Sequence, residues 1–163
     1  LNMIHEGTHG IQAIDLLGRK LRLDGGKAFS RLLAHLRKTA DKAMAHAEWQ
    51  DCGQALSKAL DEWRNAVESA WQGSDPQASL ANAVPHLQAA GHLVLAWIWL
   101  DLVLTQAEHK LKSPSQVAAD PAFVGRVSCA RYFFRYELPK IHAWLSVVSQ
   151  RDTTCMDMPL DAF

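Results

Sequence analysis

The sequence predicts an all-α fold, an antiparallel up-and-down helical bundle of about five helices. Three observations support this class. Apolar residues recur at intervals of three and four along most of the 163-residue chain, which is the spacing of one helix face. No segment shows the alternating pattern of a strand bounded by turn residues. The periodic stretches are long and the segments between them are short, which favours a bundle.

The first helix is expected to follow Thr8, whose hydroxyl can accept a hydrogen bond from an N–H of the first turn. Its apolar stripe consists of Ile11, Ile14, Leu17 and Leu21. Asp24-Gly25-Gly26 is expected to end the helix, because glycine readily adopts the positive φ angles of a helix stop.

The second and third helices are each predicted from one apolar face. The stripe of the second helix comprises Phe29, Leu33, Leu36, Ala40, Ala43 and Ala47. The stripe of the third helix comprises Leu56, Leu60, Trp63, Val67 and Ala70. We expect the break between them at Glu48 to Gly53, and the end of the third helix at Gln72-Gly73.

The fourth helix is expected to run from about Pro76 to Lys112. Ser74-Asp75-Pro76 is a start signal, because an N-cap residue precedes a proline suited to the first turn. Apolar residues fall on two faces of this helix, which predicts burial on two sides. Pro85 removes a backbone donor and is expected to kink the helix if the helix stays continuous. The fourth helix is therefore the first of two that we expect to be long and kinked by proline.

The fifth helix follows the clearest internal linker, which runs from Ser113 to Pro121. Its stripe comprises Val127, Phe134, Leu138, Ile141, Leu145 and Val148. Pro139 predicts a second proline kink. The periodicity fades after Arg151, so the tail from Thr153 to Phe163 is expected to be irregular.

Composition narrows the class of partner and the compartment. The seventeen basic and seventeen acidic side chains cancel, which argues against nucleic-acid and acidic-membrane partners. Cys52, Cys129 and Cys155 are widely spaced and odd in number, which argues against a disulfide framework and indicates a reducing, cytoplasmic compartment. The most apolar run, Leu93 to Leu104, is only twelve residues long and contains Asp101, so we expect a buried helix segment rather than a membrane span.

The densest motif stands at the start of the chain. His5-Glu6-Gly7-Thr8-His9 matches the H-E-x-x-H pattern of zinc hydrolases. In that interpretation His5 and His9 are metal ligands, and Glu6 activates a zinc-bound water.

The surroundings of the motif argue against zinc. Gly7 and Gly10 weaken a helix by about 1 kcal/mol each relative to alanine. Gln12 and Asp15 stand where the extended zinc motif carries its glycine and third histidine. We therefore predict no metal site and keep a zinc hydrolase as a remote alternative.

The same opening stretch resembles another family. Ile4 to Leu21, IHEGTHGIQAIDLLGRKL, is similar to the acyl-CoA dehydrogenase segment written (I/V)-Y-E-G-T-x-x-I-Q. Phe123 to Pro139, with Ala130-Arg131-Tyr132-Phe133, and the ending MPLDAF resemble the branch with an extra C-terminal helical domain. That branch includes the 3-methylmercaptopropionyl-CoA dehydrogenases.

The resemblance implies a role for each residue of the motif. Glu6 stands at the position of the base that removes the α-proton of an acyl-CoA thioester, while a hydride leaves the β-carbon for FAD. Burial would make this carboxylate a stronger base, because it raises the carboxyl pKa. Gly7 would lie at the substrate. Thr8, His9 and Gly10 would lie at the flavin cofactor, near a helix start that favours anions.

The resemblance also implies an organisation. Residues 1–24 would complete the dehydrogenase core, and residues 25–163 would form the appended helical bundle domain. Because the motif follows Leu1-Asn2 directly, we expect the chain to be the C-terminal part of a longer enzyme. The parent would use an acyl-CoA substrate and an electron-transfer acceptor and would form a homo-oligomer. The isolated chain would retain little or no FAD and would be inactive.

Two alternatives remain open at this point. The two-faced fourth helix also fits a non-enzymatic interaction or oligomerisation domain. A basic and aromatic cluster in the fifth helix could hold phosphate, although a polar rim on a bundle helix is the commoner explanation. The cluster comprises Arg131, Tyr132, Arg135 and Tyr136.

Overall fold

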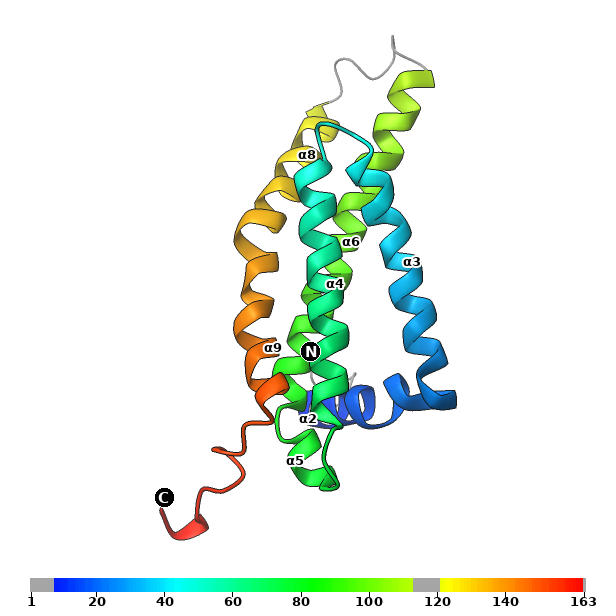
Figure 1. The fold of residues 1–163 in the computed structure, drawn as a ribbon. Helices are drawn as coiled ribbons and strands as arrows, with labels where there is room; N and C mark the ends of the chain where they lie inside the picture. Colours follow the sequence, from blue (N-terminus) through cyan, green and yellow to red (C-terminus); the bar gives the residue numbers. More distant parts are fainter. Residues whose placement is uncertain (1–7, 113–120, 163) are drawn as a thin grey trace. The chain divides into compact units, whose positions relative to one another are not determined.

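The computed structural model describes residues 8–112 and 121–162, and within these ranges every regular element is helical (Figure 1). The predicted all-α class is confirmed. The α-helices are α2 (His9–Ile14), α3 (Lys27–Met44), α4 (Gln50–Ala70), α5 (Pro76–Leu80), α6 (Ala83–Lys112), α8 (Pro121–Tyr132) and α9 (Ile141–Gln150). The shorter segments are the π-helical η1 (Asp15–Arg19) and η3 (Phe133–Glu137) and the 3-10 segments η2 (Lys20–Gly26), η4 (Leu138–Lys140) and η5 (Leu160–Ala162).

The chain divides into two compact units that share its long helices. The first unit takes its residues from Leu1–Leu32, Asp61–Ala90 and His142–Phe163. The second unit takes its residues from Leu33–Leu60 and Gly91–Ile141. Helices α3, α4 and α6 each begin in one unit and continue into the other. The candidate linker from Ser113 to Asp120 lies outside the described residues.

The first helix begins and ends where the sequence predicts. Thr8 has the extended backbone of an N-cap residue (φ −81°, ψ 141°), and its carbonyl accepts a hydrogen bond from the Gln12 N–H at 3.2 Å. The predicted cap by the Thr8 hydroxyl is wrong, since this side chain is exposed and makes no cap bond. Asp24, Gly25 and Gly26 all have positive φ angles, which confirms the predicted stop.

The break between the second and third helices is displaced from the predicted position. Helix α3 ends at Met44 and α4 starts at Gln50, so Gly53 lies inside α4 rather than in a break. A Cβ on Gly53 would stand 2.7 Å from the Ala40 carbonyl oxygen and 2.8 Å from the Met44 nitrogen. The glycine at this position therefore permits a close approach of two helix backbones in the second unit.

The predicted fourth helix is two helices. Asp75 caps α5 by accepting a hydrogen bond from the Gln77 N–H at 2.9 Å, as the start signal predicts. Helix α5 ends at Leu80 and α6 starts at Ala83, so Pro85 lies in a first turn, where no intrahelical N–H bond is lost. The predicted long helix is therefore not continuous, and the condition for a kink at Pro85 is not met. At Pro139, where a kink is predicted, the helical hydrogen-bond pattern changes, because the 3-10 segment η4 separates η3 from α9.

The most apolar run forms the core of the second unit. Leu93, Leu100 and Leu104 are fully buried there. Asp101 accepts a hydrogen bond from the Thr39 hydroxyl at 3.4 Å, and Thr39 accepts one from the Trp97 indole at 2.8 Å. One face of the run is thus buried, as predicted, whereas Leu95, Ile98 and Leu102 are exposed on another face.

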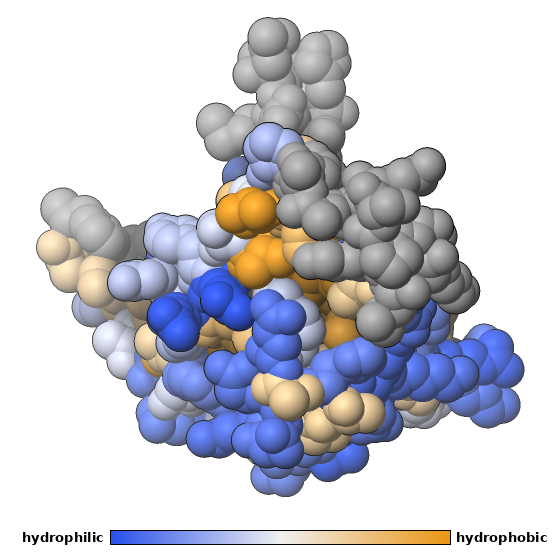
Figure 2. All heavy atoms as spheres, turned by 90° about the horizontal axis from the view of Figure 1, so that it is seen from above, coloured by the Kyte–Doolittle hydropathy of each residue, from blue (hydrophilic) through white to orange (hydrophobic). Residues whose placement is uncertain are grey.

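The surface of the molecule contains both polar and apolar areas. The helical stretch Pro76–Glu108 is long and apolar enough to cross a membrane, with a mean hydropathy of 1.6 over its most apolar window. Of that window, 39% is buried inside the structure. The core helices of soluble proteins can have the same length and composition. The face shown in Figure 2 is mostly hydrophilic, with hydrophobic side chains gathered near its centre.

The core of the first unit is built around Trp63, which is 1% exposed. The Phe29 ring meets the Trp63 ring edge-on, with centroids 4.8 Å apart. The Trp63 Nε1–H donates a hydrogen bond of 2.9 Å to Nε2 of the fully buried His86. The irregular tail is held to this unit by the Asn82 amide, which donates to the Asp152 carbonyl at 2.7 Å.

Candidate functional site

The residues that the motif assigns to flavin binding lie at the start of α2 in the first unit. Glu6 and Gly7 fall outside the described residues, as does His5 of the zinc interpretation. Thr8 and His9 are exposed and Gly10 is partly exposed. The N–H groups of the first turn of α2 have no acceptor within the helix, and the Thr8 hydroxyl bonds to none of them. This helix start can therefore donate hydrogen bonds to an anion.

An apolar hollow of about 440 Å³ lies beside this segment in the first unit. Ile11 and Ile14 line it and are 68% and 50% exposed. The Trp71 ring also lines it and is held by the guanidinium of Arg22, 3.9 Å from the ring centroid. The remaining lining residues are Asp15, Gly18, Arg19 and Leu80. The hollow can accept apolar groups, either side chains or a hydrocarbon chain.

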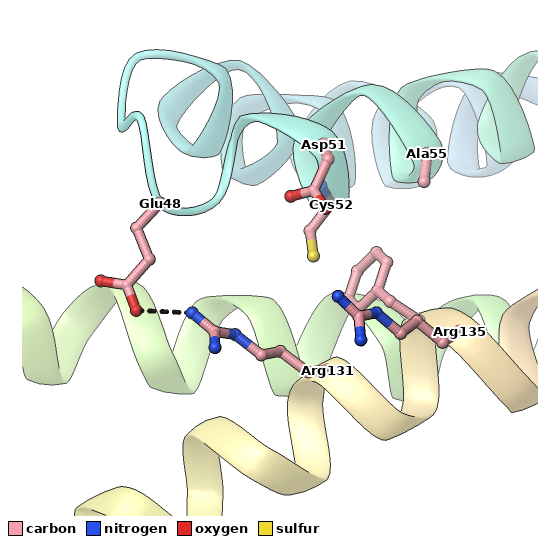
Figure 3. A pocket seen from close by; sticks show the side chains of 7 residues that line it. Glu48, Asp51, Cys52, Ala55, Arg131 and Arg135 are labelled. Atoms are coloured by element: carbon pink, nitrogen blue, oxygen red, sulfur yellow. Dashed lines mark hydrogen bonds and ion pairs between the residues drawn. The ribbon is translucent and has the colours of Figure 1, made fainter.

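A second hollow, which we name the charged pocket, lies within the second unit (Figure 3). Its volume is about 310 Å³. It is lined by Glu48, Asp51, Cys52, Ala55, Arg131, Phe134 and Arg135. Two segments supply these residues, the start of α4 with the turn before it and the junction of α8 with η3.

The charged pocket contains an ordered pair of opposite charges. Nη2 of Arg131 lies 2.9 Å from Oε1 of Glu48, and the same guanidinium lies 5.6 Å from the centroid of the Trp49 ring. In the same segment as Glu48, the Cys52 backbone N–H donates to the Asp51 carboxylate at 2.8 Å. These contacts fix Arg131 and Asp51 in place, and the guanidinium of Arg135 extends into the space near Cys52 (Figure 3).

The thiol of Cys52 is not a nucleophile. Burial raises its pKa to about 12, and the charge and hydrogen bonding of Asp51 act in the same direction. A thiol with this pKa is protonated at neutral pH, and only the thiolate attacks electrophiles. The charged pocket is therefore suited to binding rather than to covalent catalysis.

The arginines and the tyrosines of the basic and aromatic cluster, which are neighbours in the sequence, have different surroundings in the structure. Arg131 and Arg135 line the charged pocket, whereas Tyr132 and Tyr136 do not. The two tyrosine rings stack on each other, with centroids 5.0 Å apart, and both are exposed. Sequence reasoning missed the other half of the pocket because Glu48 and Arg131 are 83 positions apart.

Comparison with known proteins identifies the family. A family model described as acetyl-CoA dehydrogenase C-terminal like matches residues 32–159. The chain belongs to this family. The acyl-CoA dehydrogenase relationship predicted from the opening motif and the C-terminal segments is thereby confirmed. The matched range contains all residues of the charged pocket and begins after the motif around Glu6.

Two kinds of curated relative agree with this assignment. A butyryl-CoA dehydrogenase of Syntrophomonas wolfei is 29% identical over 97% of this chain and 26% of its own length. The 3-methylmercaptopropionyl-CoA dehydrogenase of Ruegeria pomeroyi is 35% identical over 64% of this chain and 18% of its own length. The chain thus spans about a quarter or less of the length of the curated relatives that it matches.

Proposed function

We propose that this chain is the C-terminal part of a flavin-dependent enzyme that oxidises an acyl-CoA thioester to the 2,3-enoyl-CoA. The main support is the similarity to a butyryl-CoA dehydrogenase, which extends over 97% of the chain. Both of the relatives described above carry the name of an acyl-CoA dehydrogenase. The parent enzyme would pass its electrons to an electron-transfer acceptor and would work in a reducing, cytoplasmic compartment.

In this proposal Glu6 is the base that removes the α-proton of the thioester. A carboxylate suits this task when it is partly desolvated, because the raised pKa makes it a stronger base. Gly7 has no Cβ and would allow the thioester to approach the backbone. The chemistry that bound FAD would supply is the acceptance of the hydride from the β-carbon.

The described part of the motif fits a flavin cofactor. Thr8 and His9 are exposed at the start of α2, where the helix presents N–H donors to an anion such as a pyrophosphate. At Gly10 nothing lies within 4 Å of where a Cβ would stand, so a ligand can approach the backbone. We propose that Thr8, His9 and Gly10 contact the cofactor in the complete enzyme.

The apolar hollow supports the proposed domain division. The exposed side chains of Ile11 and Ile14 follow the motif directly and leave an apolar surface uncovered within the first unit. We propose that residues 1–24 complete the dehydrogenase core and that the rest of that core covers this hollow. The bundle from residue 25 onward would then be the appended domain.

The role of Glu6 is tested in the full-length enzyme with a Glu6→Gln variant. We expect kcat on the preferred acyl-CoA of a chain-length panel to fall by about a hundredfold or more, because glutamine cannot accept the proton. The FAD content should stay at the wild-type level. Glu68→Gln, which changes an exposed glutamate on α4, is the control and should keep full activity. Wild-type rates in Glu6→Gln would remove Glu6 from the mechanism.

The isolated 163-residue chain is expected to bind little or no FAD and to turn over no acyl-CoA. It spans about a quarter of the length of a relative, so most of the surface that would enclose a flavin lies in other segments of the parent. The measurement is the flavin absorbance of the purified chain after incubation with excess FAD and gel filtration. Stoichiometric flavin would contradict this expectation.

We also propose that the chain self-associates through one face of α6. Three apolar side chains lie exposed on that face in the second unit, Leu95, Ile98 and Leu102, at 46%, 39% and 41% exposure. Gly91 and Thr105 extend the same face with the spacing of a coiled-coil seam. In an antiparallel pair with its twofold axis between Leu95 and Ile98, Gly91 would face the partner's Leu102. Nothing lies within 4 Å of the Cβ position of Gly91, so that leucine has room.

This interface is tested by placing a charge at its centre. We expect Leu95→Lys to raise the dissociation constant of the dimer about tenfold or more. The reason is that two lysine charges would be buried near the twofold axis. Light scattering after gel filtration reports the mass at each concentration. Val124→Lys, at a 63% exposed apolar position on α8, is the matched control. A monomeric wild type, or equal masses in all three proteins, would contradict the proposal.

A further inference from the structure

Arg135 is the unusual member of the charged pocket. In the part of the chain that the structure describes, its guanidinium has no hydrogen bond or ion pair, although two carboxylates line the same pocket. The residue is exposed, and its charge opposes the rise in the pKa of the nearby Cys52 thiol. Figure 3 shows the side chain extending from η3 toward the space near Cys52.

The two carboxylates of the charged pocket already have partners. Glu48 pairs with Arg131 at 2.9 Å, and Asp51 accepts the Cys52 N–H at 2.8 Å. Arg135 is therefore a cation without an ion-pair partner among the described residues, in a lining whose two carboxylates and two guanidinium groups balance in formal charge. A guanidinium presents a planar array of donors that matches the two oxygens of a carboxylate.

The walls of the charged pocket restrict the ligand further. A volume of about 310 Å³ is at the lower end of the range for small-molecule sites. The Phe134 ring and the Ala55 methyl supply apolar surface beside the arginines, which suits a short carbon chain. Because two carboxylates line the pocket, a dianion would meet more repulsion than a monoanion.

We propose that the charged pocket binds the carboxylate of a small monocarboxylic acid, with Arg135 as the principal cation and Arg131 as a second donor. The carboxylate lies between the two guanidinium groups, and its carbon chain contacts Phe134 and Ala55. The site is independent of the catalytic motif, because it is built entirely from residues of the second unit. It adds a binding function to the bundle whether or not the parent oxidises acyl-CoA.

The test is a titration of the ¹⁵N-labelled 163-residue chain, followed by amide chemical shifts, at constant ionic strength. The probes are sodium butyrate, sodium acetate and sodium phosphate. We expect saturable shifts in residues 48–55 and 131–137, with butyrate binding more tightly than acetate and acetate more tightly than phosphate. Arg135→Gln should weaken butyrate binding about tenfold or more, because it removes the principal cation.

The control is Arg64→Gln, which removes an exposed guanidinium that pairs with Asp61 at 3.1 Å. It should bind butyrate as the wild type does. Circular dichroism and thermal unfolding establish that each variant is folded before the titration. Tighter binding of phosphate than of butyrate, shifts that do not saturate, or equal butyrate binding in Arg135→Gln and the wild type would each overturn the proposal.

Discussion

Between pH 7.5 and pH 4 the chain is expected to lose about 3 kcal/mol of its unfolding free energy through His86. This histidine is fully buried, and burial lowers its pKa from 6.5 to about 4. Its Nε2 accepts the Trp63 indole hydrogen bond, so the neutral ring is the form that the first unit accommodates.

The sign of the effect follows from the two pKa values. The unfolded chain binds a proton at His86 below about pH 6.5, whereas the folded chain does so only near pH 4. The stabilisation is therefore complete above pH 6.5 and is lost as the pH falls toward 4. Urea unfolding followed by tryptophan fluorescence at pH 7.5, 6, 5 and 4 measures this loss.

A His86→Gln variant separates this histidine from the other titrating groups. Glutamine offers an oxygen to the Trp63 indole but does not titrate. Between pH 7.5 and pH 4 the unfolding free energy of the variant should therefore fall by about 3 kcal/mol less than that of the wild type. The variant will have a different stability at pH 7.5, and only the change with pH is compared. Parallel pH profiles for the two proteins would contradict the assignment.

Gly53→Ala is expected to destabilise the chain by about 2 to 3 kcal/mol. The added methyl would stand 2.7 Å from the Ala40 carbonyl oxygen and 2.8 Å from the Met44 nitrogen, and both atoms belong to the backbone of α3. Because a backbone cannot rotate away as a side chain can, α3 and α4 would have to separate within the second unit. That separation would open the packing around buried residues such as Leu36 and Leu56.

The matched control is Gly125→Ala, near the start of α8. Nothing lies within 4 Å of its Cβ position, so the methyl adds no clash and the higher helix propensity of alanine should stabilise the chain by about 1 kcal/mol. Chemical denaturation at pH 7.5 reports both changes. Effects of the same sign in the two variants would show that helix propensity, rather than contact with α3, determines the outcome at Gly53.

The sequence predicted burial and helix ends correctly where they depend on residues close together in the chain. The stripe Leu56, Leu60, Trp63, Val67 and Ala70 is buried throughout, because helical periodicity requires only that one face meet a core. Asp75 before Pro76 and the glycines after Asp24 act as helix signals through their own backbone preferences.

The errors at Gly53 and Pro85 share one cause. Gly53 and Pro85 are helix breakers by composition, and the sequence assigned each of them a local role. In the structure Gly53 lies within α4 because α3 passes close to it, and Pro85 lies in the first turn of α6, where its missing N–H has no cost. Which role such a residue takes depends on its neighbours in space.

The sequence by itself determined the all-α class, most helix boundaries and the family, because these depend on periodicity, capping and short motifs. The assignment of Glu6 and its motif stays a prediction, and it rests on a resemblance that spans adjacent residues. Only the tertiary structure decided which charges meet. The charged pocket joins Glu48 to Arg131 across 83 positions, and the burial that sets the pKa of His86 is a property of the packed first unit. Contacts of this kind depend on the distance between side chains after folding, which no local pattern in the sequence records.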